Sequence, residues 1–88
     1  MGVPVSLTEA KLFLRVEHDA EDGLIQTLID AARARVEGEV GVGLDDTAAA
    51  PLRLAVLMLA LRAYERGERD MRVAPVAAWV APYRAVRL

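Results

Sequence analysis

Residues 52–64 read LRLAVLMLALRAY, and this apolar stretch decides the fold. At about 100° per residue, Leu52, Val56 and Leu59 fall on one side of a helix. A second apolar group falls on the opposite side or its flank: Leu54, Leu57, Met58, Leu61 and Tyr64. The pattern predicts a helix over about residues 48–66 that has two apolar faces and ends at Gly67.

The preceding segment predicts a second long helix over about residues 20–40. Asp19 is the expected N-cap, and Gly41 is the expected left-handed residue after the helix ends. One face of this helix is apolar: Leu24, Ile25, Leu28, Ile29, Ala32, Val36 and Val40. Two pairs of opposite charge stand four residues apart, the spacing of ion pairs on a helix surface: Arg33–Glu37 and Arg35–Glu39.

Short segments flank the two long helices. Ser6-Leu7-Thr8-Glu9 fits a capping box, which predicts a helix over about residues 7–15. Residues 65–72 are charged without an apolar period and predict a connector, and residues 76–81 predict a short helix that Pro82 stops. The expected fold is all-α: one small four-helix domain over residues 1–88, in which the helices at about 20–40 and 48–66 are central and antiparallel.

Size and composition narrow the possible functions. The chain has 88 residues, one histidine and no cysteine. The chain therefore lacks most of the side chains needed for a thiol nucleophile, a Ser-His-Asp triad or a metal site with nitrogen or sulfur ligands. We expect neither an enzyme nor a cofactor. A domain of this size buries only about 60–65% of its unfolded surface, too little to cover a central helix on both faces. A contact between subunits is the simplest way to cover the second face.

Charge is distributed unevenly along the chain. Residues 51–88 carry seven arginines against three acidic residues, whereas residues 1–50 carry four basic residues against ten acidic ones. The net charge of -2 argues against a protein that neutralises many nucleic-acid phosphates. Three uses of the C-terminal arginines stay open: head-to-tail complementarity between subunits, a DNA-facing channel surface, and solvated helix ends. The arginines are Arg62, Arg66, Arg69, Arg72, Arg84 and Arg87.

Three further features have an ordinary and a functional interpretation. His18 lies in an acidic turn and is more typical of an exposed histidine than of a general base. Asp45 and Asp46 are more typical of helix caps than of a divalent-cation site. Trp79 and Tyr83 stand one turn apart and either close the core or anchor a partner, with neither interpretation favoured.

The sequence resembles the small head-tail connector (adaptor) proteins of long-tailed bacteriophages, a family that also occurs in prophages and gene transfer agents. Three stretches carry the resemblance: 6–16, with SLTEAK followed by LRV; 22–37, with DGLI, LI and AARARVE; and 80–84, VAPYR. Their order and spacing carry more weight than any one of them. Gly38 and alanine-rich positions depart from the bulkier residues usual in the family, which bears on the detail of the subunit contact.

The resemblance implies a structural subunit without a cofactor. Such a subunit assembles into a ring of about twelve copies under the portal protein, extends the DNA channel and contacts the next neck or tail-completion protein. DNA would pass without sequence-specific binding, no membrane would be involved, and the protein would lie in the virion neck after assembly in the bacterial host cytoplasm. The alternative is a small dimeric helical regulator that binds nucleic acid through its Arg-rich C-terminal third.

Overall fold

The computed structural model describes residues 2–84, and all regular structure in that range is helical. The chain forms five α-helices and a final 3-10 helix: α1 (Leu7–Leu14), α2 (Asp22–Val40), α3 (Ala50–Arg66), α4 (Glu68–Val73), α5 (Val76–Val80) and η1 (Ala81–Tyr83). The all-α expectation is confirmed, with one more short helix in this range than the four expected.

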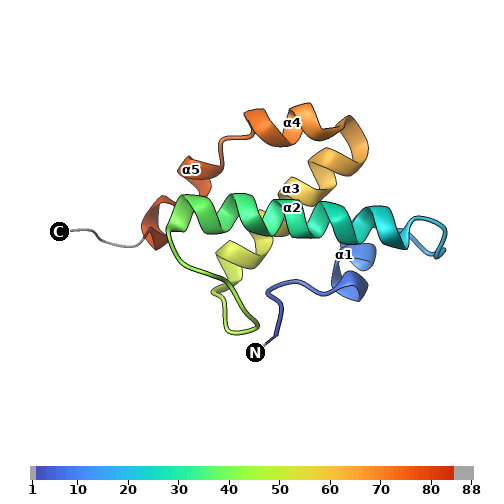
Figure 1. Cartoon of the computed structure of the whole chain (residues 1–88), viewed down its shortest axis with the longest axis horizontal. Coiled ribbons are helices and arrows are strands. Elements are labelled where there is room, and N and C mark those ends of the chain that lie inside the picture. The colour runs from blue at the N-terminus through green and yellow to red at the C-terminus, as the bar shows by residue number, and fades with distance from the viewer. Residues whose placement is uncertain (1, 85–88) are drawn as a thin grey trace.

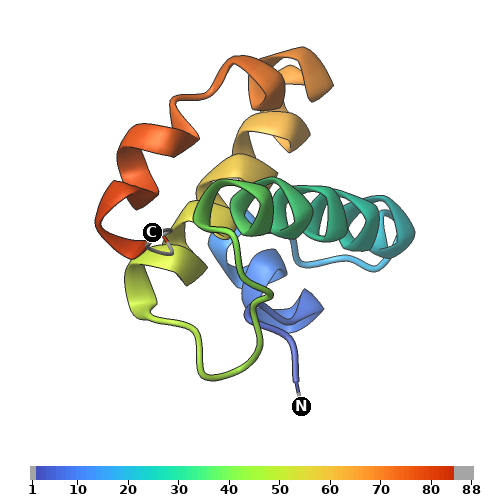
Figure 2. The same cartoon turned by 60° about the vertical axis from the view of Figure 1, so that its left-hand side comes forward.

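The two long helices form the centre of a thin molecule. α3 crosses α2 obliquely in both views, and α1 lies beside the first half of α2 (Figures 1 and 2). α4 extends from the end of α3 at the opposite edge, and α5 returns toward the end of α2 (Figure 1). The shortest dimension is 16 Å, which is about two layers of helices. A helix in one of two layers keeps one side open unless another element covers it.

The core lies between α2 and α3. From α2 it takes five residues of the expected face, which are buried: Ile25, Ile29, Ala32, Val36 and Val40. From α3 it takes Leu52, Val56 and Leu59 together with small alanines that allow close approach. The apolar face expected on α2 was too wide at its start, because Leu24 is 50% exposed and Leu28 is only partly buried.

The start of α2 differs from the expectation. The helix begins at Asp22 rather than near residue 20, and Glu21 stands at the N-cap without a side-chain hydrogen bond. Asp19 is not the cap, because its carboxylate lies 2.7 Å from the ammonium of Lys11 on α1. Lys11 also lies 2.8 Å from Asp22. A tertiary ion pair has therefore replaced a local cap, whereas the expected left-handed Gly41 is confirmed with φ 82°.

The loop into α3 also differs in its caps. α3 begins at Ala50 rather than near residue 48, and its N-cap Ala49 has no side-chain hydrogen bond. Asp45 accepts hydrogen bonds from the backbone N–H and hydroxyl of Thr47 at 2.8 and 2.6 Å, so it stabilises the loop itself. These two bonds hold the pKa of the Asp45 carboxyl below its ordinary value. The end of α3 is as expected, at Arg66 before Gly67.

An ion pair on α2 holds the same loop. Arg33 Nε donates to Glu37 at 3.1 Å, as the four-residue spacing predicted. The pair also binds both backbone groups of buried Leu44: Arg33 donates to its carbonyl at 2.5 Å, and Glu37 accepts from its N–H at 2.7 Å. The expected Arg35–Glu39 pair is wrong, because Arg35 donates to backbone carbonyls beyond α3 and Glu39 pairs with Arg84.

The segment expected to be an irregular connector contains α4. Glu68–Val73 is helical because Met71 finds a buried position, which a charged sequence without an apolar period did not indicate. Gly67 permits the corner between α3 and α4 with φ 95° and ψ 172°, a region that side chains other than glycine rarely adopt. α5 then ends at Val80, and Pro82 lies within η1 rather than directly after the helix.

The N-terminal segment is fixed beneath α3. Pro4 and Val5 are buried, and Arg53 Nε donates to the Pro4 carbonyl at 3.0 Å. The predicted capping box is confirmed, with the Ser6 and Glu9 bonds both at 3.1 Å. A second nitrogen of Arg53 pairs with the Glu9 carboxylate, so one residue of α3 secures both the segment and α1.

Glu9→Gln should make the protein less stable at neutral pH, and this loss should shrink as the pH falls below 4.5. The Ser6 backbone N–H and, after it, Arg53 hold the pKa of Glu9 below 4.5, its ordinary value. A depressed folded-state pKa contributes stability above 4.5 that is lost as pH falls through the lower folded value. Because the side chain is 41% exposed, solvent screening limits the expected loss to about 0.5 kcal/mol.

Urea unfolding of both proteins at pH 7 and pH 3 measures this effect. The difference between the two proteins should be full at pH 7 and should shrink as the pH falls from 4.5 toward 3, because Glu9 takes up a proton in this direction. Other carboxylates titrate in both proteins and cancel in the comparison. An equal difference at both pH values would contradict a role for the Glu9 charge.

No helix within the described residues has both the length and the apolar character needed to cross a membrane.

Candidate subunit interface

The outer side of α3 carries an incompletely covered apolar stripe. Leu54, Met58 and Leu61 are spaced by four and three residues, so they lie along one side of the helix. Leu54 is 47% exposed, while Met58 and Leu61 are partly buried. The side containing Leu52, Val56 and Leu59 is buried instead. We call Leu54, Met58 and Leu61 the outer stripe.

The outer stripe is narrower than the face expected from the sequence. Leu57 and Tyr64 were expected to belong to the same face, but both pack against the core. Their helical angle places them at the boundary between the two sides, where neighbouring helices reach them. The structure thus brings together three of the five apolar residues proposed as a contact and uses the other two within the subunit.

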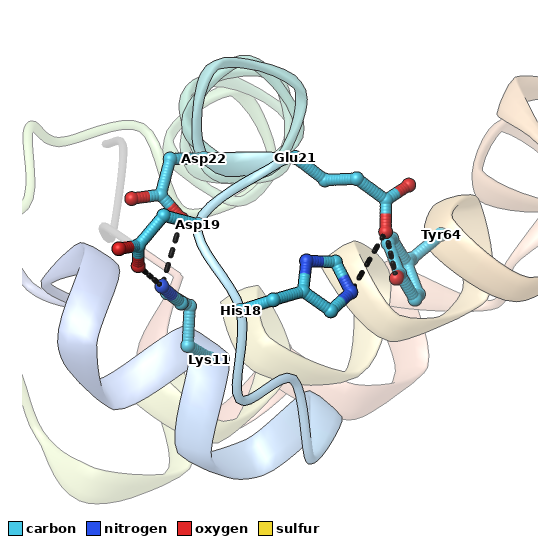
Figure 3. Close-up of polar contacts among 6 residues, drawn as sticks. All are labelled: Lys11, His18, Asp19, Glu21, Asp22 and Tyr64. Carbon is cyan, nitrogen blue, oxygen red and sulfur yellow. Dashed lines mark hydrogen bonds and ion pairs between the residues drawn. The ribbon is translucent and has the colours of Figure 1, made fainter.

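Tyr64 makes a polar contact with the turn that precedes α2. Its hydroxyl donates to Glu21 at 2.6 Å, which raises the pKa of Tyr64 above its ordinary 10.0. His18 Nε2 lies 3.8 Å from the same Glu21 oxygen (Figure 3). Asp19 and Asp22 lie on the other side of the turn, around Lys11 (Figure 3). The turn therefore joins α1, α2 and α3, and His18 has a surface position with 59% of its side chain exposed.

Arg62 and Trp79 hold α3 against the C-terminal helices. The Arg62 guanidinium lies 5.3 Å from the centre of the Trp79 ring, within the range of a cation–π contact. It also lies 3.7 Å from Asp70, and Arg66 lies 3.9 Å from the same carboxylate. Trp79 is partly buried and packs against the core. Of the two interpretations of Trp79, the structure favours closure of the core.

Most of the arginines proposed as contacts already have partners within the subunit, and Arg87 lies outside the described residues. Arg72 lies 3.8 Å from Glu68, and Arg84 donates to the carbonyl and carboxylate of Glu39 at 3.0 and 3.1 Å. Arg69 is exposed and forms no ion pair with another described residue. Four of these arginines, Arg62, Arg66, Arg72 and Arg84, therefore lie within 4 Å of an acidic group of the same chain.

Other exposed apolar residues were not proposed from the sequence. Leu12 is 75% exposed and Val73 is 70% exposed, both more than Tyr83 at 38%. Leu12 points away from the face of α1 that carries Ala10, and helical periodicity alone would have revealed this. Val73 was missed because its helix was missed. Among described residues, no group of three potential metal-ligating side chains lies together, Asp45 and Asp46 included.

Comparison with family models gives a match over most of the chain. The model described as "Phage gp6-like head-tail connector protein" matches residues 4–74, from the buried Pro4 to the residue after α4. Comparisons with curated proteins and with solved structures gave no significant match. The matched range contains the outer stripe, both long helices and the acidic turn, and it ends before α5.

Proposed function

Because the chain belongs to the phage head-tail connector family, we propose that it is a structural subunit of a ring of identical copies in the virion neck. The ring docks under the portal protein, extends the DNA channel and presents its far rim to the next neck or tail-completion protein. It contains about twelve subunits, the number suggested by the family resemblance. Assembly takes place in the bacterial host cytoplasm, and DNA passes through without sequence-specific binding.

The exposed outer stripe is the observation that supports a contact between subunits. Leu54 leaves nearly half of its surface exposed on the central helix, although such a small domain has little apolar surface to spare. Copies related by rotation bury such a stripe against a different surface of the neighbour, and repetition of that contact closes a ring. Exposed Leu12 and Val73 lie outside the stripe and supply further apolar surface for neighbours or for the adjoining neck proteins.

The dimeric regulator is the weaker candidate. It requires arginines free to bind phosphate, whereas Arg62, Arg66, Arg72 and Arg84 lie within 4 Å of acidic groups of the same chain. It also gives no reason for the family match over residues 4–74.

Native mass spectrometry of the chain, alone and mixed with the portal complex, tests the proposal. We expect a closed species of about twelve copies, either alone at high concentration or after the portal is added, because modest contacts assemble weakly without a template. A strict dimer at every concentration, with an affinity for DNA that falls steeply with salt, would instead identify the regulator. Absence of any assembly with the portal would overturn the ring.

A further inference from the structure

α4 packs against α3 but buries few of its own side chains. Met71 is the one buried residue within Glu68–Val73, while four residues of this six-residue helix are exposed. An isolated helix of this length is unstable in water, so its order depends on tertiary contacts. In Figure 1 α4 lies at the edge of the molecule, beyond α3 and apart from the length of α2.

The backbone leaves the helical conformation on both sides of α4. Gly67 has φ 95° and ψ 172°, which separates α4 from α3. Ala74 is extended with φ -62° and ψ 141°, as expected for a residue that precedes proline. Beyond it, Val76 and Val80 are fully buried and fix α5 to the body. Residues 67–74 can therefore change position while α3 and α5 stay in place, which exposes two residues that are buried in the closed position, Met71 and Ala74.

Arg35 is the link from α2 to this segment. It donates to the Met71 carbonyl at 2.7 Å and to the Ala74 carbonyl at 3.2 Å. Each carbonyl also accepts a backbone hydrogen bond, that of Met71 from the Ala74 N–H at 3.4 Å and that of Ala74 from the Val76 N–H at 2.8 Å. Both lie at or just after the C-terminal end of α4, where a cation is favourable. The guanidinium therefore adds to these bonds and joins the end of α4 to α2.

Asp70 acts on the closed position in two opposite ways. Its carboxylate lies 3.7 Å from Arg62 and 3.9 Å from Arg66 on α3, so two long ion pairs favour the closed position. Its Oδ2 atom is nevertheless buried without a hydrogen-bond partner among the described residues, which is costly, and movement of α4 would return it to water. The closed position therefore gains from Met71, Arg35 and these ion pairs but loses the hydration of Asp70 Oδ2.

From these contacts we propose that residues 67–74 form a hinged flap, held closed by Arg35, which opens as a unit while α3 and α5 remain folded. Opening uncovers Met71 next to Val73, which is already exposed, and so presents two apolar residues on one short segment. The flap does not depend on the proposed ring, because every contact in the argument lies within a single chain.

Hydrogen exchange followed by mass spectrometry tests the flap on the intact chain. The wild-type amides of α4 should exchange about a hundredfold faster than those of α3, through an opening that exposes little surface and so depends weakly on urea. Arg35→Met keeps the apolar stem and removes both hydrogen bonds. It should raise exchange in α4 about tenfold more and leave α2 and α3 unchanged.

Arg33→Met is the matched control. Arg33 lies two residues earlier on α2 and also donates to a backbone carbonyl, that of Leu44 in the other loop. Its replacement should speed exchange at Leu44 and leave α4 as in the wild type. If α4 is as protected as α3 in the wild type, or if Arg35→Met accelerates all helices equally, the flap is wrong.

Arg35→Lys keeps the test decisive if the methionine variant fails to fold. Lysine retains the charge, but its single ammonium cannot reproduce the fork that reaches two carbonyls. The exchange rate of the α4 amides should therefore lie between the rates in the wild type and in Arg35→Met, with circular dichroism unchanged. Wild-type protection in α4 of this variant would show that the two hydrogen bonds do not hold the flap.

Discussion

Leu59→Ala is expected to destabilise the protein by about 3 kcal/mol, within the range of leucine truncations that leave a cavity in a packed core. Leu59 is fully buried between the two long helices. A domain of this size has a total stability of only about 4–13 kcal/mol. The change therefore removes a large fraction of the stability, and the midpoint of thermal unfolding should fall by about 12–24 °C.

Leu54→Ala provides the matched control for this prediction. It makes the same chemical change on the same helix, but the side chain is 47% exposed. Its effect on urea or thermal unfolding should be below about 1 kcal/mol, because little buried surface is lost. Equal losses at the two positions would mean that the outer stripe is covered within the single chain, contrary to the assignment of the two sides of α3.

Leu54→Glu should abolish or strongly weaken assembly while the subunit stays folded. The carboxylate remains in water in the free subunit, but it becomes a buried, unpaired charge if the outer stripe meets a neighbour. We expect the affinity between subunits to fall at least thirtyfold, which corresponds to about 2 kcal/mol. Native mass spectrometry with the portal complex measures the loss, and circular dichroism checks the fold.

The control for assembly is Ala31→Glu, which places the same charge at an exposed position on α2, outside the outer stripe. This variant should assemble as the wild type does. Assembly of Leu54→Glu at wild-type concentrations would move the subunit contact to another surface, such as the one around Leu12. Failure of both variants would point to a general effect of added negative charge rather than to the stripe.

The long helices were predictable because their burial follows periodicity. The spacing of Leu52, Val56 and Leu59 is a local property of the sequence, and the helix end at Gly67 depends on the conformational freedom of one residue. The capping box at Ser6 and Glu9 is likewise complete within four residues. Such features require no knowledge of what the helix packs against.

The errors arose where a distant residue decided the local structure. Asp19 is a good cap by type, but Lys11 on another helix binds it more favourably. Arg35 has Glu39 four residues away, yet it reaches carbonyls 36 and 39 residues along the chain. α4 exists because Met71 finds a buried position, and a six-residue charged segment carries too little pattern to indicate that.

The candidate interface was predictable in kind but not in extent. The sequence indicated that α3 has more apolar surface than a small domain can cover, and Leu54 is indeed exposed. It did not indicate that Leu57 and Tyr64 would be used inside the subunit, because the positions of α1 and the acidic turn depend on tertiary contacts. For the same reason it did not indicate that most of the arginines have an acidic group of the same chain nearby.

The hydrogen bond between Arg53 and Pro4 bears on the order in which the chain folds. It joins residues 49 positions apart, whereas α2 and α3 are neighbours along the chain. Contacts between near neighbours in the chain close smaller loops and form early, whereas distant contacts lose more conformational entropy on loop closure. The α2–α3 pair is therefore the natural folding nucleus, and the N-terminal segment docks late, once its partner surface on α3 already exists.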